Sequence, residues 1–311
     1  YKASNQNWMI EQHENGWMYF ANNKGLLEYD GTEWNTYPIN NAKLRAIYLD
    51  NERIYVGGLG QFGFFLPNNK GTLTYKCLSN GINKKKVGNI WNIIKIDQSI
   101  FFQSDKSIFC FENNKLRIIK CPHGSVCAAY LYNKLYIVSS TGLEVFNGDR
   151  FEQVVSWEPF IHSKIVKLLP YDDKILIVSS KDGLFVYDKH VIYPLNSPIN
   201  STIKNKQLLC AAITPQALAL GSVQDGAYIY SFQNKTTENF SINNGLQNKT
   251  VLSMKFDSDN NLWLGLDNGI DCIHLDSSYF FLYSSKSAIG AGYSSSIYNG
   301  YIYFGTNQGV Y

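Results

Sequence analysis

The sequence predicts an all-β fold, a β-propeller built from four-stranded blades. Two observations lead to this prediction: a short apolar segment, a polar turn and a glycine recur along the chain, and helical periodicity is absent. The recurring segments begin at Trp17, Ile54, Ile100, Leu135, Ile175, Ala217, Leu262 and Tyr301. Their spacing of 35 to 46 residues fits one blade per copy. An α/β barrel is excluded because no helix-length segments separate the predicted strands.

Each copy contributes four predicted strands. The first precedes the recurring segment, and the second is apolar at nearly every position, which is typical of a strand covered on both faces. The third begins after a glycine such as Gly183, because a tight hairpin needs a residue with positive φ. The fourth is more polar, with alternating apolar residues such as Trp34 and Tyr37, and fits an outer edge. The third copy has Ser107 at the glycine position and is predicted to be the least regular.

The number of blades follows less directly from the repeats. We expect residues 1–311 to form a single propeller domain, with residues 285–311 as an eighth, incomplete copy. Either this copy closes a ring of eight blades with strands from both ends, or seven blades form the ring and the copy begins a second propeller. The eighth copy stops at Tyr311 without an outer strand, and the repeats alone leave both arrangements open.

Composition excludes several classes of partner. The formal charge is +3, and the one tight basic cluster, residues 84–86, fits a solvated loop, so we expect no nucleic-acid binding. No stretch approaches the roughly 18 apolar residues of a membrane span, so we expect no membrane contact by this segment. The chain opens at Tyr1 rather than Met, so we expect it to be a processed or trimmed piece.

No pattern of reactive residues points to catalysis, a metal or a cofactor. The six cysteines form no Cys-x-x-Cys pair and lie in apolar segments, so they are predicted to be core residues rather than metal ligands. The five histidines are dispersed, and neither a phosphate loop nor a dinucleotide fingerprint occurs. Asp257 and Asp259 fit a hairpin turn, and no carboxylates are paired for glycoside hydrolysis. The sequence therefore predicts a protein that is not an enzyme.

The predicted binding site is the face where the turns between second and third strands meet. Loops on a rigid ring are the default place for function. The predicted tips are rich in amides and carboxylates and poor in cations, which suits a polar neutral ligand such as a sugar chain. The candidate ligand-binding residues are Asn22, Asn23, Gln61, Phe62, Asp105, Lys181, Asp182, Gln224, Asp225, Asp267, Asn268, Asn307 and Gln308.

The seventh copy resembles a known repeat. Residues 256–270 read Phe-Asp-Ser-Asp-Asn-Asn-Leu-Trp-Leu-Gly-Leu-Asp-Asn-Gly-Ile, which is similar to the two-component regulator propeller repeat, with its turn, Leu-Trp-Ile-Gly-Thr segment and Gly-Leu strand. Residues 7–10 and 20–31, and likewise 290–295 and 303–309, are similar to such sensors of Bacteroidetes-type bacteria. Copies three to six depart from the Trp-Ile-Gly-Thr core, so the resemblance is weakest there.

The resemblance implies a location and a function. In that family two seven-bladed propellers usually precede a β-sandwich, one membrane span and a cytoplasmic kinase or helix-turn-helix output. The resemblance therefore favours seven blades, with the eighth copy as the beginning of a second propeller. The chain would then be a periplasmic, ligand-binding sensor domain of a regulator of signal transduction and transcription, which acts as a homodimer and senses a ligand such as an oligosaccharide. The alternatives are a propeller scaffold for protein–protein binding and, less favoured, a polysaccharide-active enzyme.

Overall fold

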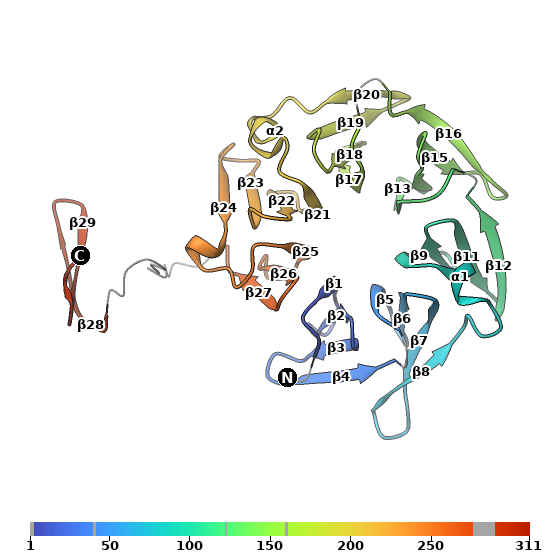
Figure 1. The fold of residues 1–311 in the computed structure, drawn as a ribbon, viewed down its shortest axis with the longest axis horizontal. Coiled ribbons are helices and arrows are strands. Elements are labelled where there is room, and N and C mark those ends of the chain that lie inside the picture. The colour runs from blue at the N-terminus through green and yellow to red at the C-terminus, as the bar shows by residue number, and fades with distance from the viewer. Residues whose placement is uncertain (1–2, 40–41, 122, 159–160, 276–289) are drawn as a thin grey trace.

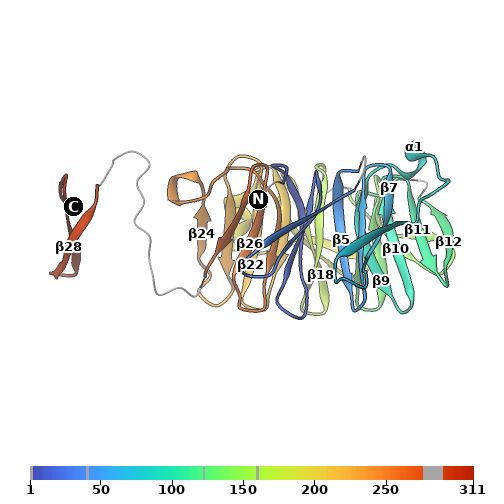
Figure 2. The same ribbon diagram turned by 90° about the horizontal axis from the view of Figure 1, so that it is seen from below.

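Seven antiparallel sheets stand side by side around a central axis (Figure 1). The computed structural model describes residues 3–39, 42–121, 123–158, 161–275 and 290–311. Strands account for 58% of the described residues and helix for 4%, and the sheets match those of β-propellers, so the predicted fold class is confirmed. Seen from the side, the strands run along the axis of the ring (Figure 2).

Each sheet is one blade, with its first strand next to the axis. Blades 1 to 3 consist of β1 (Asn7–Gln12), β2 (Met18–Asn22), β3 (Gly25–Tyr29), β4 (Trp34–Pro38), β5 (Leu44–Asp50), β6 (Arg53–Gly58), β7 (Gln61–Pro67), β8 (Leu73–Cys77), β9 (Ile90–Ile96), β10 (Ser99–Ser104), β11 (Ser107–Glu112) and β12 (Lys115–Lys120). Blades 4 to 7 consist of β13 (Cys127–Leu131), β14 (Lys134–Val138), β15 (Gly142–Phe146), β16 (Phe151–Ser156), β17 (Ile165–Tyr171), β18 (Lys174–Ser179), β19 (Leu184–Asp188), β20 (Val191–Pro194), β21 (Leu208–Ile213), β22 (Ala217–Ser222), β23 (Ala227–Ser231), β24 (Thr237–Phe240), β25 (Val251–Phe256), β26 (Leu262–Leu266) and β27 (Ile270–Ile273).

Three short helical segments lie in connections between blades. They are α1 (Lys84–Val87), α2 (Pro198–Ile203) and the 3-10 turn η1 (Ile242–Asn244). Each connects the outer strand of one blade to the inner strand of the next. The lysines of α1 are exposed, as expected for a solvated loop.

The core consists of layers between neighbouring blades. Every residue of β2 and of β22 is buried, which explains why the second strands are continuously apolar. Leu26 of blade 1, for example, shares a cluster with Ile47 and Val56 of blade 2. Each blade is therefore stabilised by the two blades beside it.

The third blade is regular, contrary to the prediction drawn from Ser107. Strands β10 and β11 pair without a register shift, and so do β11 and β12. No residue of its hairpin turn has a positive φ, so glycine is not needed there. The Ser104 hydroxyl donates a hydrogen bond to the Ser107 carbonyl at 2.9 Å and closes the turn instead.

The ring closes where blade 7 packs against blade 1. The Asn7 side chain donates to the Gly269 carbonyl at 2.9 Å, and the Ser253 hydroxyl donates to the Asn7 carbonyl at 3.0 Å. The rings of Phe20 and Trp263 lie 5.9 Å apart across the same interface. In the described residues every strand of blade 1 comes from the N-terminal end and every strand of blade 7 from the other, so side-chain contacts rather than a shared sheet join the two blades.

The eighth copy forms a separate three-stranded sheet. It consists of β28 (Gly292–Tyr298), β29 (Tyr301–Thr306) and β30 (Gly309–Val310), which lie outside the ring (Figure 1). No hydrogen bond between the described residues joins this sheet to the ring. The described ring therefore has seven blades.

The cysteines are free thiols in all six positions. Cys110, Cys121, Cys127 and Cys210 are buried, as predicted for core residues, whereas Cys77 and Cys272 are half-buried. Burial raises the pKa of Cys127 to about 11 and that of Cys210 to about 12.

We expect Asn7→Ala to weaken ring closure. The substitution removes a fully buried amide and leaves the half-buried Gly269 carbonyl without its side-chain donor, at a cost of about 1–3 kcal/mol in the free energy of unfolding. Urea denaturation measures this loss. Asn69→Ala is the control, because Asn69 is exposed in a loop. Equal stability of the two variants would show that Asn7 does not hold the ring closed.

Stability should fall as the pH rises above about 9. The folded chain keeps the protons of Cys127 and Cys210 to a higher pH than the unfolded chain, whose thiols titrate near the ordinary value of 9.0. Alkaline pH therefore favours the unfolded state, by up to about 1.4 kcal/mol per pH unit for each thiol. Thermal melts from pH 8 to pH 10.5 should show a shallower decline for the Cys127→Ala, Cys210→Ala double variant. Parallel curves would contradict this assignment.

Candidate functional site

The inner strands enclose an axial channel with a cavity of about 680 Å³. Residues of β1, β5, β9, β17, β21 and β25 line it, and so do Val126 and Cys127 at the start of blade 4. This volume lies within the range that holds small-molecule ligands. The channel is therefore the candidate binding site.

A β-bulge recurs near the start of the inner strands. In β5 the pairing register with the second strand shifts between Leu44 and Ala46, which leaves Arg45 unpaired. The same shift occurs in β9, β17, β21 and β25, and a wider one in β1 between Asn7 and Ile10. A bulge turns its extra side chain away from the regular pleat. In each of these six blades one side chain is thereby directed to the same end of the channel.

We call that end the channel mouth and define it by one bulge residue from each of these six blades, together with Val126, which directly precedes the inner strand of blade 4. The residues are Trp8, Arg45, Trp91, Val126, Val166, Leu209 and Leu252, all of which line the cavity. Blades 1 to 3 supply two indoles and a guanidinium, and blades 4 to 7 supply aliphatic side chains. The mouth therefore has an aromatic and cationic half and an aliphatic half.

The aromatic half is held together by direct contacts. The guanidinium carbon of Arg45 lies 4.0 Å from the centroid of the Trp8 ring, a cation–π contact. The rings of Trp8 and Trp91 meet edge to face, with centroids 6.2 Å apart. These three side chains come from three successive blades, so ring geometry rather than chain proximity brings them together.

Polar side chains at the turns support this half. The Asn23 amide oxygen accepts from Arg45 Nη1 at 2.6 Å and from Trp8 Nε1 at 3.2 Å. Asn23 in turn donates to Gln6 Oε1 at 2.8 Å, and Gln6 donates to Asp267 of blade 7. Asp105 accepts from Trp91 Nε1 at 2.7 Å. The orientation of both indoles is thus fixed before any ligand arrives.

Arg45 is half-buried and has no acidic partner. Burial lowers the pKa of its guanidinium to about 10, so the group stays protonated at neutral pH. Within the described part of the chain no carboxylate lies within ion-pair distance of it. With the residues that the structure describes, its side chain makes hydrogen bonds from Nη1, to Asn23 and to the Leu44 carbonyl.

The residues predicted from the sequence lie in different environments in the structure. Asn23, Asp105 and Asp267 are the side chains that support the aromatic half of the mouth. Asn22 and Phe62 do not lie on the surface, because both are fully buried. Asn22 hydrogen-bonds Ser4, Gln6, Asn7 and the Lys24 amide, and Phe62 packs against Phe102 and Phe109.

Blades 5 and 6 place their predicted residues in turns. Asp182 accepts hydrogen bonds from the backbone amides of Ser163 and His162 at 2.6 and 2.9 Å. Burial raises the pKa of Asp182, but these amides outweigh it and hold the pKa below its usual range. Asp225 lies 3.6 Å from the Lys206 ammonium, and its own backbone amide donates to Ser222. These carboxylates stabilise loops.

The remaining candidates make little contact with the channel. Lys181, Gln224 and Asn268 are exposed at turns, and Gln61 is half-buried at the start of β7. Asn307 and Gln308 lie in the turn before β30, outside the ring, where Asn307 accepts from the Ala291 amide at 3.0 Å. None of these six lines the channel.

Sequence reasoning missed Trp8, Arg45 and Trp91. A signal for them exists, because each is the second residue of an inner strand. Aligning the eight copies on their first strands would have shown the two tryptophans and the arginine at one equivalent position. The candidate residues were taken from the turns instead, because the turns carry the glycines that mark the repeat.

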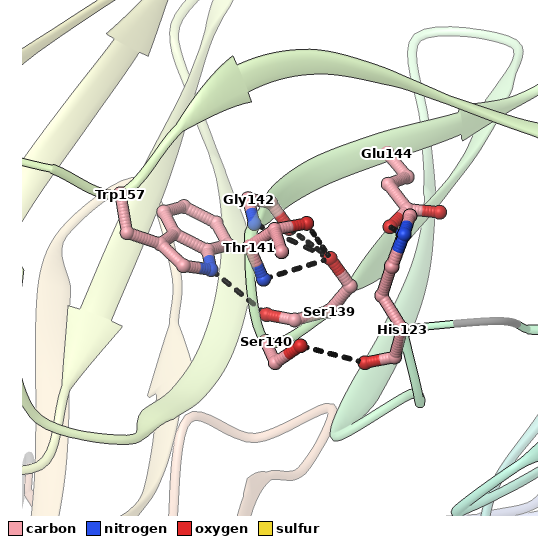
Figure 3. A network of polar contacts seen from close by, with 7 residues as sticks. All are labelled: His123, Ser139, Ser140, Thr141, Gly142, Glu144 and Trp157. Atoms are coloured by element: carbon pink, nitrogen blue, oxygen red, sulfur yellow. Dashed lines mark hydrogen bonds and ion pairs between the residues drawn. The ribbon is translucent and has the colours of Figure 1, made fainter.

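Blade 4 contains an arrangement that resembles part of a hydrolytic triad (Figure 3). His123 Nδ1 lies 3.1 Å from Oε1 of the buried Glu144, while the imidazole is half exposed. The nearby hydroxyls bond to backbone oxygens: Ser140 donates to the His123 carbonyl and Ser139 to the Gly142 carbonyl. Neither serine hydroxyl bonds to the imidazole, so the described residues form no paired nucleophile and base there.

The described residues contain neither a metal-binding cluster nor a membrane-spanning helix. They contain no group of three His, Cys, Asp or Glu side chains that could hold a metal ion. They also contain no helix long and apolar enough to cross a membrane.

Fold and site together define a seven-bladed β-propeller with a ligand-sized axial channel. The family model described as Two component regulator propeller matches residues 245–277, which include β25, β26 and β27. The resemblance to that family is thus confirmed at the seventh repeat. Trp263, the characteristic tryptophan of this repeat, is the residue that packs against Phe20 at ring closure.

Solved structures with the same fold include two from B. thetaiotaomicron. The extracellular domain of BT3049, described as a hybrid two component system, has 17% identity and a TM-score of 0.72 over 98% of this chain and 45% of its own. That of BT4673, described in the same way, has 19% identity and a TM-score of 0.70 over 97% and 43%. This chain therefore spans less than half the length of those domains.

An enzyme also shares the fold. Virginiamycin B lyase from Staphylococcus aureus has 12% identity and a TM-score of 0.64, over 86% of this chain and 93% of its own. A search of curated protein sequences finds no match. At these identities the likenesses establish the β-propeller fold.

Proposed function

We propose that this chain is the ligand-binding propeller of an extracytoplasmic sensor in a bacterial regulator of signal transduction and transcription. The family match at blade 7 supports this proposal, and so does the similarity to two extracellular domains of two component systems. The periplasm is the compartment that such a sensor occupies. The intact receptor, which the family resemblance predicts to be a homodimer, would carry ligand occupancy to an output domain.

The ligand that we propose is a carbohydrate bound at the channel mouth. The observation that carries this proposal is the contact of Trp8, Arg45 and Trp91. A sugar ring has an apolar face of C–H groups, which packs on an indole, and an edge of hydroxyls, which needs hydrogen-bond partners. The mouth offers both, because guanidinium and amide groups lie beside the indoles.

Binding rather than turnover is the function that the channel supports. Its two carboxylates, Glu11 and Asp257, already have partners: Glu11 pairs with Lys255 at 2.7 Å, and Asp257 accepts from Trp263 Nε1 at 2.9 Å. The acidic groups of the channel are therefore engaged in holding blades 1 and 7 in place. A sensor needs selective contacts, and the mouth provides these.

We further propose that β28–β30 begin a second propeller. This sheet repeats the first three strands of a blade, including the bulge, which here skips Tyr293. Tyr293, Ile297 and Tyr301 are 76%, 74% and 70% exposed. Exposed apolar side chains of this kind on a strand mark a surface that another element covers, and here that element would be a following blade. The B. thetaiotaomicron domains are more than twice as long as this chain, which is long enough to include a second ring.

We expect Trp91→Ala to lower carbohydrate affinity by at least tenfold, because it removes one of the two indoles that would pack on the sugar. A glycan array identifies the ligand, and calorimetry measures its affinity for each variant. Trp17→Ala is the matched control, since Trp17 is 38% exposed in the turn between β1 and β2, at the opposite end of the strands.

Two results would contradict the proposed function. One is the absence of binding to any glycan of the array, and the other is an affinity that Trp91→Ala leaves unchanged. Reducing-sugar release from the bound glycan should stay at the level of the blank, because the mouth holds binding groups only.

A further inference from the structure

Arg45 has N–H donors that no described residue accepts from, and these could bind an acidic group of a ligand. A guanidinium carries five N–H donors. Both hydrogens of Nη1 are engaged, with Asn23 Oδ1 at 2.6 Å and with the Leu44 carbonyl at 3.1 Å. No side chain or carbonyl of the described residues accepts from Nε or Nη2. These two atoms form the edge of the guanidinium that meets both oxygens of a carboxylate.

The position of the guanidinium is fixed by its neighbours. It lies 4.0 Å from the centroid of the Trp8 ring, whose own Nε1 donates to the same Asn23 oxygen at 3.2 Å. Asn23 is held in turn by Gln6. Arg45 is therefore preorganised, and little side-chain entropy remains to be lost when a ligand binds.

The channel lining as a whole is positively charged, as Arg45 is. Four basic residues line it, Arg45, Lys164, Lys167 and Lys255, against the two acidic residues Glu11 and Asp257. Lys255 is neutralised by Glu11 at 2.7 Å, but no ion pair joins Lys164 or Lys167 to any described residue. A cleft with excess positive charge attracts anions. The channel thus differs from the turn tips, whose composition suggested a neutral ligand.

We propose that the carbohydrate bound at this mouth is acidic, and that Arg45 binds its carboxylate through Nε and Nη2. Uronic acids and sialic acids are the sugars that carry such a group. The indoles of Trp8 and Trp91 would pack on the sugar rings, and Lys164 and Lys167 would add attraction at longer range. This inference rests on the proposed carbohydrate-binding function and narrows the class of ligand.

The test uses the 311-residue chain and three classes of oligosaccharide: neutral, sulfated without carboxylates, and containing uronic or sialic acid. An array screen is followed by calorimetry of the best binder and of its counterpart in which the carboxyl group is reduced to an alcohol. We expect the binders to carry a carboxylate, and reduction of that group to lower the affinity at least tenfold.

Variants of Arg45 complete the test. Arg45→Gln should lower the affinity for the acidic glycan as much as carboxyl reduction does, and combining the two changes should cause little further loss. Arg45→Lys should restore only part of the affinity, because an ammonium lacks the planar fork. Arg53→Gln is the control, since Arg53 lies over Phe64 and does not line the channel.

The outcomes separate this inference from the proposed function. Binding of neutral or sulfated glycans that is lost in Trp91→Ala but unchanged in Arg45→Gln would overturn the acidic ligand and leave the carbohydrate sensor intact. An acidic binder that is insensitive to Arg45→Gln would also overturn it. Failure of every glycan to bind would overturn the proposed function, and this inference with it.

Discussion

Noncovalent closure of the ring is the constraint on which the rest of the structure depends. Blade 7 meets blade 1 through Asn7, Ser253 and the packing of Trp263 on Phe20, between residues as much as 262 positions apart. Only a closed ring turns seven inner strands into the wall of one channel. Closure also brings Asp267 to Gln6, and through Gln6 and Asn23 it helps to fix Arg45 and Trp8. The interface that holds the fold together is thus continuous with the proposed binding site.

Repetition explains how such a site arises without disturbing the core. A bulge near the start of six of the seven inner strands places a side chain at the mouth, outside the fully buried layers between blades. These positions are free to vary, and they do: aromatic and cationic in blades 1 to 3, aliphatic in blades 4 to 7. Recognition can therefore change by single substitutions while the apolar second strands remain the same.

The fold was predictable because its signal is local, whereas the site depends on pairing register. Continuous apolar second strands and turn glycines can be recognised within one copy, and burial of β2 and β22 confirms that reasoning. Asn23, Asp105 and Asp267 were found because turns carry polar residues. Asn22 is buried because its side chain donates to the Ser4 carbonyl, in the segment before β1. Phe62 is buried because it fills the layer between blades 2 and 3. Trp8, Arg45 and Trp91 were missed because a bulge is a property of two paired strands, and neither strand shows it alone.

The central claim is that ligand binds at the channel mouth, and the six tryptophans allow a direct test. Labelling the indole nitrogens with ¹⁵N gives each Trp Nε1–H its own NMR signal, which single Trp→Phe variants assign. On titration with a glycan that binds, the account predicts shifts for Trp8 and Trp91, at the mouth, and none for Trp17, Trp34 or Trp263. Saturable binding that leaves the signals of Trp8 and Trp91 in place would contradict it.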